Sequence, residues 1–224
     1  MENDKMKTAN DGKTTLLDYT FVLDASGSMS GDIAEVLEET NLQIRELKKL
    51  HEETKRPCQV TIVKFDSRYE VLRRAVRIEN LQELTSSEYY AGGSTSLFDA
   101  FGTAIESADE RVGHLVERQE AQALVMVFTD GGENSSQKFT AREVSALFQK
   151  FQEKEGWELA LIGSDVQSIM DMQRVNLKSS KMRGYRQDEK RQAIRNASES
   201  VLHFYAEKDQ FFMLDKNVDL KKRK

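Results

Sequence analysis

The chain changes from apolar to polar within Thr20-Phe21-Val22-Leu23-Asp24-Ala25-Ser26-Gly27-Ser28, where a short hydrophobic run ends at a carboxylate, two hydroxyls and a glycine. Apolar residues at helical spacing follow at once, from Ile33 to Leu47. In open α/β folds a buried parallel strand delivers such a polar loop to the carboxyl edge of the sheet, where these folds bind their ligands. The stretch therefore predicts a strand, a functional loop and a helix, in that order.

Two more polar stretches have the same placement. Gly92-Gly93-Ser94-Thr95-Ser96 precedes a predicted helix, and Thr129-Asp130-Gly131-Gly132 directly follows the most apolar predicted strand. Because loops that follow neighbouring parallel strands share one edge of the sheet, we expect the three stretches to meet in space. The sequence thus indicates one hard divalent cation held between them.

Strands and helices alternate along the sequence. The hydrophobic patterns predict strands over residues 16–24, 60–65, 69–78, 123–128 and 157–162. They predict helices over residues 32–53, 97–115, 140–151, 166–175 and 188–206, with an irregular or short-strand region near 178–186. The second and third strands are joined by a short turn, so they form an antiparallel hairpin. The expected fold class is α/β: a doubly wound, Rossmann-like, mostly parallel central sheet with one antiparallel hairpin at its edge and helices on both faces.

The 224 residues are expected to form one domain over 15–207, between a frayed arm at 1–14 and a charged tail at 208–224. The composition, 32% charged and 38% apolar, excludes wholesale disorder. The single cysteine, Cys58, excludes an internal disulfide and favours a reducing compartment. The polar start of the chain lacks the apolar core of a signal peptide, and no run approaches the roughly 20 apolar residues that span a bilayer. We therefore expect a cytoplasmic protein that does not associate with membranes.

The oxygen-bearing side chains of the first loop suit a hard cation. Mg²⁺ takes about six oxygen ligands in near-octahedral geometry and keeps several waters where the protein supplies few. Alternate residues of an extended turn point the same way, so Asp24, Ser26 and Ser28 converge, while Gly27 allows the sharp backbone path. Mg²⁺ is the expected ion, with Mn²⁺ and Ca²⁺ as alternatives.

The same residues also have simpler interpretations. Asp24 and Thr95 can act as helix caps, the two serines as turn residues, and Asp130-Gly131-Gly132 as an ordinary turn. Capping and metal binding are compatible at Thr95. The three elements occur in order, each at the end of a predicted strand or the start of a helix, and this context favours the metal site.

Together, Asp24-x-Ser26-x-Ser28, Thr95 and Asp130-Gly131 resemble the metal-ion-dependent adhesion site of the von Willebrand factor A domain family. The segment from Gly92 to Ala100 is similar to the Gly-Gly-Thr loop and helix start of short stand-alone bacterial and phage members, with Thr95 as the matching threonine. The resemblance extends over residues 15–207 in the order of strands and helices.

This resemblance implies roles for five residues. Ser26, Ser28 and Thr95 would bind the metal through their hydroxyls, and Asp24 and Asp130 would bind it directly or through water. It also implies an open coordination position that a glutamate or aspartate of a partner protein takes. Neutral hydroxyl ligands leave a cation less neutralised, so an incoming carboxylate gains more than a water would.

A partner-binding rim is expected around the metal. It consists of loop residues beside the five ligands: Met29, Ser94, Ser96, Gly131, Glu133 and Asn134. Glu133 and Asn134 extend the third loop and can line this rim, but their residue types favour a surface position without function. Tyr89 and Tyr90 precede the second loop, and we predict that they pack under it.

The expected function is a metal-dependent protein-binding module rather than an enzyme. A Mg²⁺-dependent phosphoryl-transfer or hydrolytic enzyme would need a general acid or base beside the metal. Asp24 is one carboxylate, but no second motif of the sequence supplies an acid–base partner for it, and there is no Lys-bearing phosphate loop. A nucleic-acid-associated protein is the other alternative, because residues 174–224 carry 14 Lys and Arg against 7 Asp and Glu. The preceding residues carry 19 against 31, and this acidic body argues against nucleic acid as the main partner.

Overall fold

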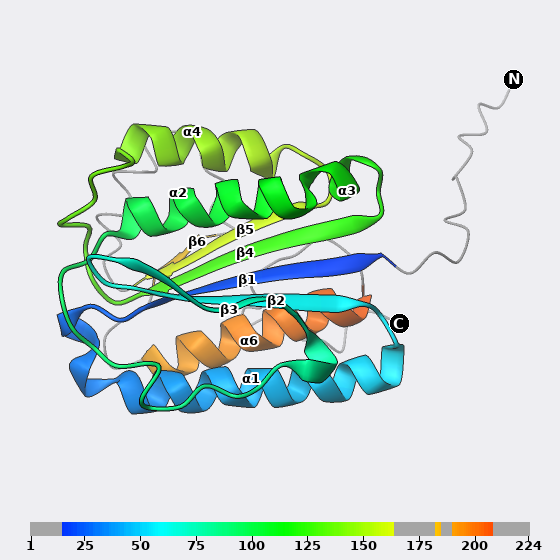
Figure 1. Ribbon diagram of the computed structural model, residues 1–224, viewed down its shortest axis with the longest axis horizontal. Helices are drawn as coiled ribbons and strands as arrows, with labels where there is room; N and C mark the ends of the chain where they lie inside the picture. The colour runs from blue at the N-terminus through cyan, green and yellow to red at the C-terminus, as the bar shows by residue number, and fades with distance from the viewer. Residues whose placement is uncertain (1–14, 164–181, 185–189, 208–224) are drawn as a thin grey trace, which may run out of the picture.

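The computed structural model describes residues 15–163, 182–184 and 190–207. A six-stranded sheet in the order β3-β2-β1-β4-β5-β6 forms the centre (Figure 1). The strands are β1 (Leu16–Asp24), β2 (Cys58–Phe65), β3 (Tyr69–Arg77), β4 (Ala121–Thr129), β5 (Trp157–Gly163) and β6 (Met182–Gly184). Neighbouring strands are parallel except β2 and β3, which pair antiparallel. The predicted doubly wound α/β fold with one antiparallel edge is therefore confirmed.

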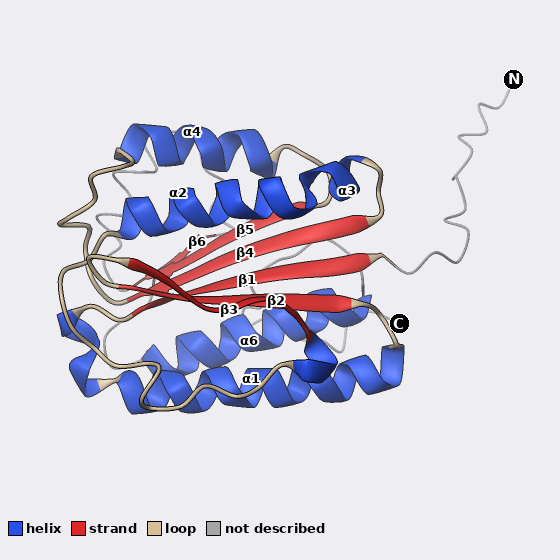
Figure 2. Ribbon diagram, viewed as in Figure 1, coloured by secondary structure: helices blue, strands red, loops and turns tan. Residues whose placement is uncertain are grey.

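Helices cover both faces of the sheet (Figure 2). One face carries α2 (Leu97–Ala108), α3 (His114–Glu117) and α4 (Ala141–Gln152), and the other carries α1 (Ile33–Thr54) and α6 (Lys190–Glu207). Short 3₁₀ turns at Gly27–Gly31 and Ile78–Asn80 follow β1 and β3. The predicted helix over 166–175, the arm at 1–14 and the tail at 208–224 lie outside the described residues.

The predicted helix over 97–115 is not continuous. A π-helical turn at Asp109–Gly113 separates α2 from α3. A side chain at Gly113 would collide with the carboxylate of Asp109, so a glycine fits this turn. The wider turn leaves the hydrophobic spacing almost unchanged, which is why the sequence pattern does not reveal it.

The predicted helix starts differ in how they are capped. Asp32 stands at the N-cap position of α1 but makes no capping bond with its side chain. Thr140 forms the predicted cap of α4 as part of a reciprocal capping box with Glu143. The start of α1 instead follows directly from the 3₁₀ turn after β1, which fixes the chain before the helix begins.

The central strands β1 and β4 are apolar on both sides because helices cover both faces of the sheet. In β4, Leu124, Met126 and Phe128 pack toward α1 and α6, whereas Val125 and Val127 pack toward α2 and α4. All five side chains are fully buried. This close packing fixes the ends of both strands, so the loops that follow them start from a rigid edge.

A buried ion pair lies in the amino-terminal half of β1. Asp18 accepts hydrogen bonds from Arg111 Nε at 3.0 Å, Arg111 Nη2 at 2.6 Å and Gln59 Nε2 at 2.7 Å. Arg111 belongs to the π-helical turn and also donates to the hydroxyl of Thr20 at 2.9 Å. The side chains of Asp18 and Arg111 are 0% and 18% exposed. The turn thus carries a cation that neutralises a buried carboxylate of the sheet.

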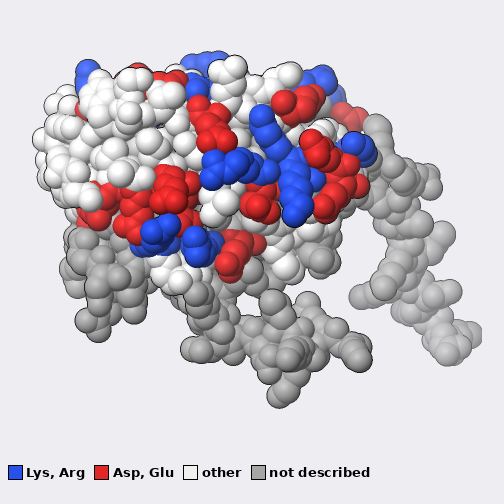
Figure 3. All heavy atoms as spheres, turned by 90° about the horizontal axis from the view of Figure 1, so that it is seen from below, with Lys and Arg blue, Asp and Glu red and all other residues white. Residues whose placement is uncertain are grey.

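The face formed by α1 and α6 carries charges of both signs (Figure 3). Arg191 and Arg195 of α6 both donate to the buried carboxylate of Glu39 in α1, at 2.9 and 3.0 Å. Arg191 also lies 3.2 Å from Glu38. These two arginines of the basic C-terminal region therefore join two helices rather than forming a free basic surface.

Cys58 is buried at the start of β2, and burial raises the pKa of its thiol to about 12. Since the thiolate is the reactive form, this environment makes the cysteine unreactive at neutral pH. None of the helices in the described ranges is long and apolar enough to cross a membrane.

Candidate metal centre

The three polar loops meet at the carboxyl edge of the sheet, on the left of Figure 1. The first and second loops run side by side, because Gly27 N donates to Gly93 O at 3.1 Å and Gly92 N donates to Ala25 O at 2.8 Å. Gly93 has a φ of 71°, a conformation that favours glycine. The sheet topology thus gathers segments that are far apart in the sequence.

Asp24 is fully buried at the end of β1. Its Oδ1 accepts a hydrogen bond from Ser26 N at 2.7 Å, and its Oδ2 accepts one from the hydroxyl of Thr129 at 2.5 Å. Burial raises the pKa of the Asp24 carboxyl, and the hydrogen bonds from Ser26 and Thr129 partly oppose this. No Lys or Arg of the described residues pairs with this carboxylate. Its negative charge therefore lacks a counter-ion from that part of the protein.

Ser26, Ser28 and Asp130 form a connected row of oxygen atoms. Ser26 Oγ lies 3.1 Å from Ser28 Oγ, and the hydroxyl of Ser28 donates to Asp130 Oδ1 at 2.7 Å. Ser26 and Asp130 are buried, whereas Ser28 is exposed. The row therefore leads from the interior to the protein surface.

Thr95 joins the same group of oxygens beside Gly131. A Cβ atom at Gly131 would lie 3.1 Å from Thr95 Oγ1 and 3.3 Å from Ser28 Oγ, so both hydroxyls face this glycine closely. Any side chain there would crowd them. The five residues predicted to bind a metal therefore belong to one compact cluster built from three loops.

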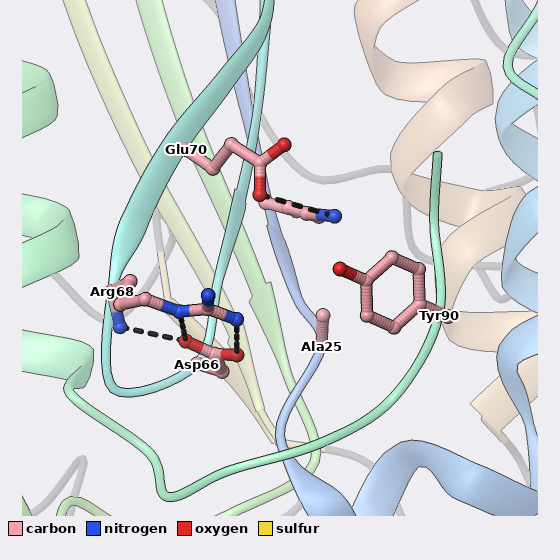
Figure 4. A pocket seen from close by; sticks show the side chains of 6 residues that line it. Ala25, Asp66, Arg68, Glu70 and Tyr90 are labelled. Carbon is pink, nitrogen blue, oxygen red and sulfur yellow. Dashed lines mark hydrogen bonds and ion pairs between the residues drawn. The ribbon is translucent and has the colours of Figure 1, made fainter. Parts of the chain in front are cut away.

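The turn between β2 and β3 supports the second loop. Ser96 N donates to Asp66 O at 3.0 Å, and a Cβ at Gly93 would lie 3.2 Å from the Asp66 side chain. Arg68 in turn holds Asp66 through Nε at 3.3 Å and Nη2 at 3.0 Å (Figure 4). The loop that carries Thr95 is thus packed against a rigid hairpin.

The two tyrosines before the second loop differ. Tyr89 is fully buried, and its hydroxyl donates to the backbone carbonyl of Asp24 at 2.5 Å, so the prediction that it packs under the loop is confirmed. Tyr90 is 50% exposed, with its ring 4.0 Å from Lys64 Nζ, and the same prediction is wrong for it (Figure 4). Tyr89 closes a turn in which its N–H donates to Thr85 O at 3.1 Å, and Tyr90 follows this turn.

The predicted rim contains both exposed and buried residues. Ser94 and Asn134 are exposed. Met29 is fully buried in the core, because the 3₁₀ turn after β1 directs its side chain inward. Ser96 is also buried, and its Oγ lies 2.8 Å from Ser135 Oγ. The prediction that Met29 and Ser96 line an exposed rim is therefore wrong.

Two residues have roles that the sequence analysis does not assign. Thr129 donates to Asp24 because the β1–β4 register pairs Leu23 with Phe128 and so sets the next two residues beside each other. The sequence signal for this contact is the threonine that ends β4, the strand next to β1. Glu133 is partly buried and accepts hydrogen bonds from the backbone N–H groups of Phe98 and Ser135, so its carboxylate holds the third loop against the start of α2. No local pattern reveals its partners.

The chemistry of the cluster fits a hard cation. It offers two carboxylates and three hydroxyls, and oxygen atoms are the ligands that Mg²⁺ and Mn²⁺ prefer. Within the described ranges no group of three or more His, Cys, Asp or Glu side chains is placed to hold a metal ion.

Solved structures share the fold at low sequence identity. The PilB minor pilin from Streptococcus sanguinis is 11% identical with a TM-score of 0.61, over 88% of this chain and 63% of that chain. A von Willebrand factor type A protein from Catenulispora acidiphila is 11% identical with a TM-score of 0.55, over 84% of this chain and 43% of that chain. The manganese-loaded TRAP protein from Plasmodium vivax is 19% identical with a TM-score of 0.53, over 81% and 72%. The chain thus spans less than two thirds of the first two proteins, and these likenesses show the fold alone.

The sequence itself identifies the family. No curated protein matches the chain. A model of the von Willebrand factor type A domain, however, matches residues 18–208, which include all three loops of the cluster and nearly all of the sheet. The chain therefore belongs to the von Willebrand factor type A domain family.

Proposed function

We propose that the chain is a metal-dependent protein-binding module. Asp24, Ser26, Ser28, Thr95 and Asp130 hold Mg²⁺, with Mn²⁺ or Ca²⁺ as alternative ions, and an Asp or Glu side chain of a partner protein binds the metal at a position that the chain leaves open. One observation carries the proposal: Ser28 Oγ lies 2.7 Å from Asp130 Oδ1 although 102 residues separate them. The fold has brought two loops together at their polar side chains.

The ligand set explains why the partner is expected to be acidic. Three of the five ligands are neutral hydroxyls, so a bound cation keeps more of its charge than it would among carboxylates alone. An incoming carboxylate therefore gains more from this cation than a water molecule does. Ser28 is the exposed member of the cluster, so the approach from solvent is on its side. The manganese-loaded relative supports a divalent ion on this fold.

The alternative functions have less support. The names of the structural relatives above describe a minor pilin and a TRAP protein, and neither name describes an enzyme. Arg191 and Arg195 are paired with Glu39, which offsets part of the positive charge that a nucleic acid would need. A cytoplasmic location stays a prediction from the sequence.

Two serines of one turn test the metal. Mg²⁺ should raise the melting temperature of the wild type and of Ser30→Ala, but not of Ser28→Ala. Both serines are exposed and belong to the same 3₁₀ turn, and the melting temperature in EDTA records separately what Ser28→Ala loses with the hydrogen bond to Asp130. An ion that binds the native state stabilises it by about 2.7 kcal/mol when its free concentration is 100 times Kd. The same Mg²⁺ response in all three proteins would contradict the metal assignment.

Partner binding needs its own test. A protein captured by the immobilised wild type in Mg²⁺ should be released by EDTA, and immobilised Ser28→Ala should not retain it. Capture that persists in EDTA would show that the partner uses a different surface. The two tests separate a site that binds metal from a site that also binds protein.

A further inference from the structure

The backbone of Thr95 is held on both sides by one residue of the third loop. Asn134 Oδ1 accepts a hydrogen bond from Thr95 N at 2.9 Å, and Asn134 N donates to Thr95 O at 3.1 Å. Thr95 is 3% exposed, whereas Asn134 is exposed. The bridge therefore runs from the surface to the edge of the oxygen cluster.

Two carboxylates fix the segment that carries Asn134 against the start of α2. Glu133 accepts hydrogen bonds from Phe98 N at 2.9 Å and from Ser136 N at 2.7 Å. Asp99 accepts bonds from the backbone N–H groups of the three residues that follow Ser136, at 2.8, 2.8 and 2.7 Å. Asn134 is thus fixed relative to the helix that begins two residues after Thr95.

The bridge determines where the Thr95 hydroxyl lies. Threonine is stiff about its first side-chain torsion, so the position of its backbone largely sets the position of Oγ1. That oxygen lies close to Gly131, as the hydroxyl of Ser28 does, 3.1 and 3.3 Å from where a Cβ of residue 131 would be. Hydrogen bonds from outside a ligand set orient the ligands in this way, and their loss commonly weakens metal binding.

We propose that Asn134 is a positioning residue of the candidate metal centre and acts on the metal through Thr95. The inference rests on the proposed metal binding and extends it to a residue that supplies no ligand. Asp130 and Asn134 belong to the same loop. That loop therefore provides one ligand itself and places a second, Thr95, through two hydrogen bonds.

Asn41 provides a matched control. Its Nδ2 donates to Leu84 O at 2.9 Å, and its Oδ1 accepts from Leu84 N at 2.8 Å, so it also bridges the N–H and the carbonyl of a single residue. This second bridge joins α1 to the segment after β3 and includes none of the three loops. Asn41→Ala therefore removes two side-chain hydrogen bonds outside the cluster, whereas Asn134→Ala removes one and leaves the backbone bond from Asn134 N to Thr95 O in place.

The experiment measures the Kd of Mn²⁺ for the full chain by electron paramagnetic resonance, and the melting temperature in EDTA separately. Asn134→Ala is expected to weaken Mn²⁺ binding by about tenfold or more. Asn41→Ala is expected to lower the melting temperature in EDTA while its Kd stays within about twofold of the wild type, since its bridge is structural. A wild-type Kd in Asn134→Ala would overturn the proposal.

A double-mutant cycle tests the route through Thr95. Thr95→Val removes the hydroxyl and keeps the shape of the side chain, so adding Asn134→Ala to it should cause little further loss of affinity. If the two substitutions instead weaken Mn²⁺ binding independently, so that their fold-changes in Kd multiply, Asn134 does not act through Thr95 and the proposal is overturned. In Thr95→Ser, which keeps a hydroxyl and serves as a second background, Asn134→Ala should keep its full effect.

Failure of the positioning role is distinct from failure of the proposed function. If the wild type binds no Mn²⁺, the metal site itself is wrong. A second outcome is that the wild type binds Mn²⁺, Ser28→Ala does not, and Asn134→Ala binds as tightly as the wild type. This result would support the metal site and contradict only the positioning role of Asn134.

Discussion

Two aspartates of β1 are both buried, but they are neutralised differently. Asp18 receives two hydrogen bonds from the guanidinium of Arg111, at 2.6 and 3.0 Å. Asp24 receives a backbone N–H and the hydroxyl of Thr129, and no Lys or Arg from the described part of the chain. A buried carboxylate without a cation is unfavourable, which agrees with the raised pKa of Asp24. One end of the strand thus carries its own counter-ion and the other does not.

This difference separates structure from function within one strand. The pair of Asp18 and Arg111 is complete inside the fold and leaves nothing for a ligand to add. Asp24 instead stands among hydroxyls beside Ser28, which is exposed, and in the proposed function a metal ion from solution supplies its counter-ion. The contrast can be tested by removing each charge in turn.

The largest effect is expected at the complete ion pair. Arg111→Ala leaves Asp18 buried without its cation and should lower the free energy of unfolding by about 3–5 kcal/mol, measured by urea denaturation. Arg118→Ala is the control, because Arg118 is 58% exposed where it pairs with Glu120 at 3.2 Å. An exposed pair of this kind should contribute less than about 1 kcal/mol.

A second substitution identifies the cause of that loss. Adding Asp18→Asn to Arg111→Ala removes the uncompensated charge and should restore part of the stability. If the double variant is no more stable than Arg111→Ala, the lost packing of the arginine side chain explains the effect. The two ends of β1 would then differ less in their electrostatics than the hydrogen bonds indicate.

Asp24→Asn is expected to behave in the opposite way. In EDTA it removes a buried charge without a counter-ion, so the free energy of unfolding should stay equal or rise. In Mg²⁺ the variant should lack the stabilisation of the wild type, about 2.7 kcal/mol when the free ion is at 100 times Kd. Thermal unfolding with and without Mg²⁺ measures both effects. A loss in EDTA as large as that of Arg111→Ala would remove the contrast between the two aspartates.

The sequence predicts the fold well where burial leaves a direct pattern. Thr20 to Leu23 and Ala123 to Phe128 are apolar on both sides, which is typical of central parallel strands, and both lie in the middle of the sheet. The π-helical turn leaves no such pattern, because it changes the hydrogen bonding of the helix without changing the apolar spacing. The structure shows that this turn carries Arg111, which donates a hydrogen bond to Asp18.

The candidate site is predictable in its loops and not in its supporting contacts. Parallel topology alone brings the loops of Ser28 and Asp130 to one edge. Asn134 and Thr95 instead meet through a backbone bridge that depends on how two loops fold against each other, so no spacing in the sequence reveals it. The place of Met29 directly after Ser28 predicts a rim position, but the 3₁₀ turn after β1 directs its side chain into the core.

The smallest effect is expected at a carboxylate that is paired near the surface. Glu88 accepts hydrogen bonds from Arg73 at 2.7 Å and from the hydroxyl of Thr85 at 2.8 Å. The bond from Arg73 is the main reason that the pKa of Glu88 falls from its ordinary 4.5 to about 2. Because the pKa is lower in the folded state, the charged pair stabilises the fold above pH 4.5, and this stabilisation is lost as the pH falls toward 2. Glu88 is partly exposed, so its contribution should stay below about 1 kcal/mol.

Glu88→Gln measures this contribution against pH. The difference in unfolding free energy between the wild type and Glu88→Gln should be largest near neutral pH and should decline between pH 4.5 and about 2. Thr85→Val removes one hydrogen bond to the carboxylate and so raises its pKa in the folded state, which should make the decline smaller and end it at a higher pH in that variant. A difference that does not change with pH would show that Arg73 acts by packing rather than by charge. A difference that fades as expected would show that Arg73 neutralises Glu88, as Arg111 neutralises Asp18. Asp24 would then be the one of these three carboxylates without a Lys or Arg partner in the described part of the chain.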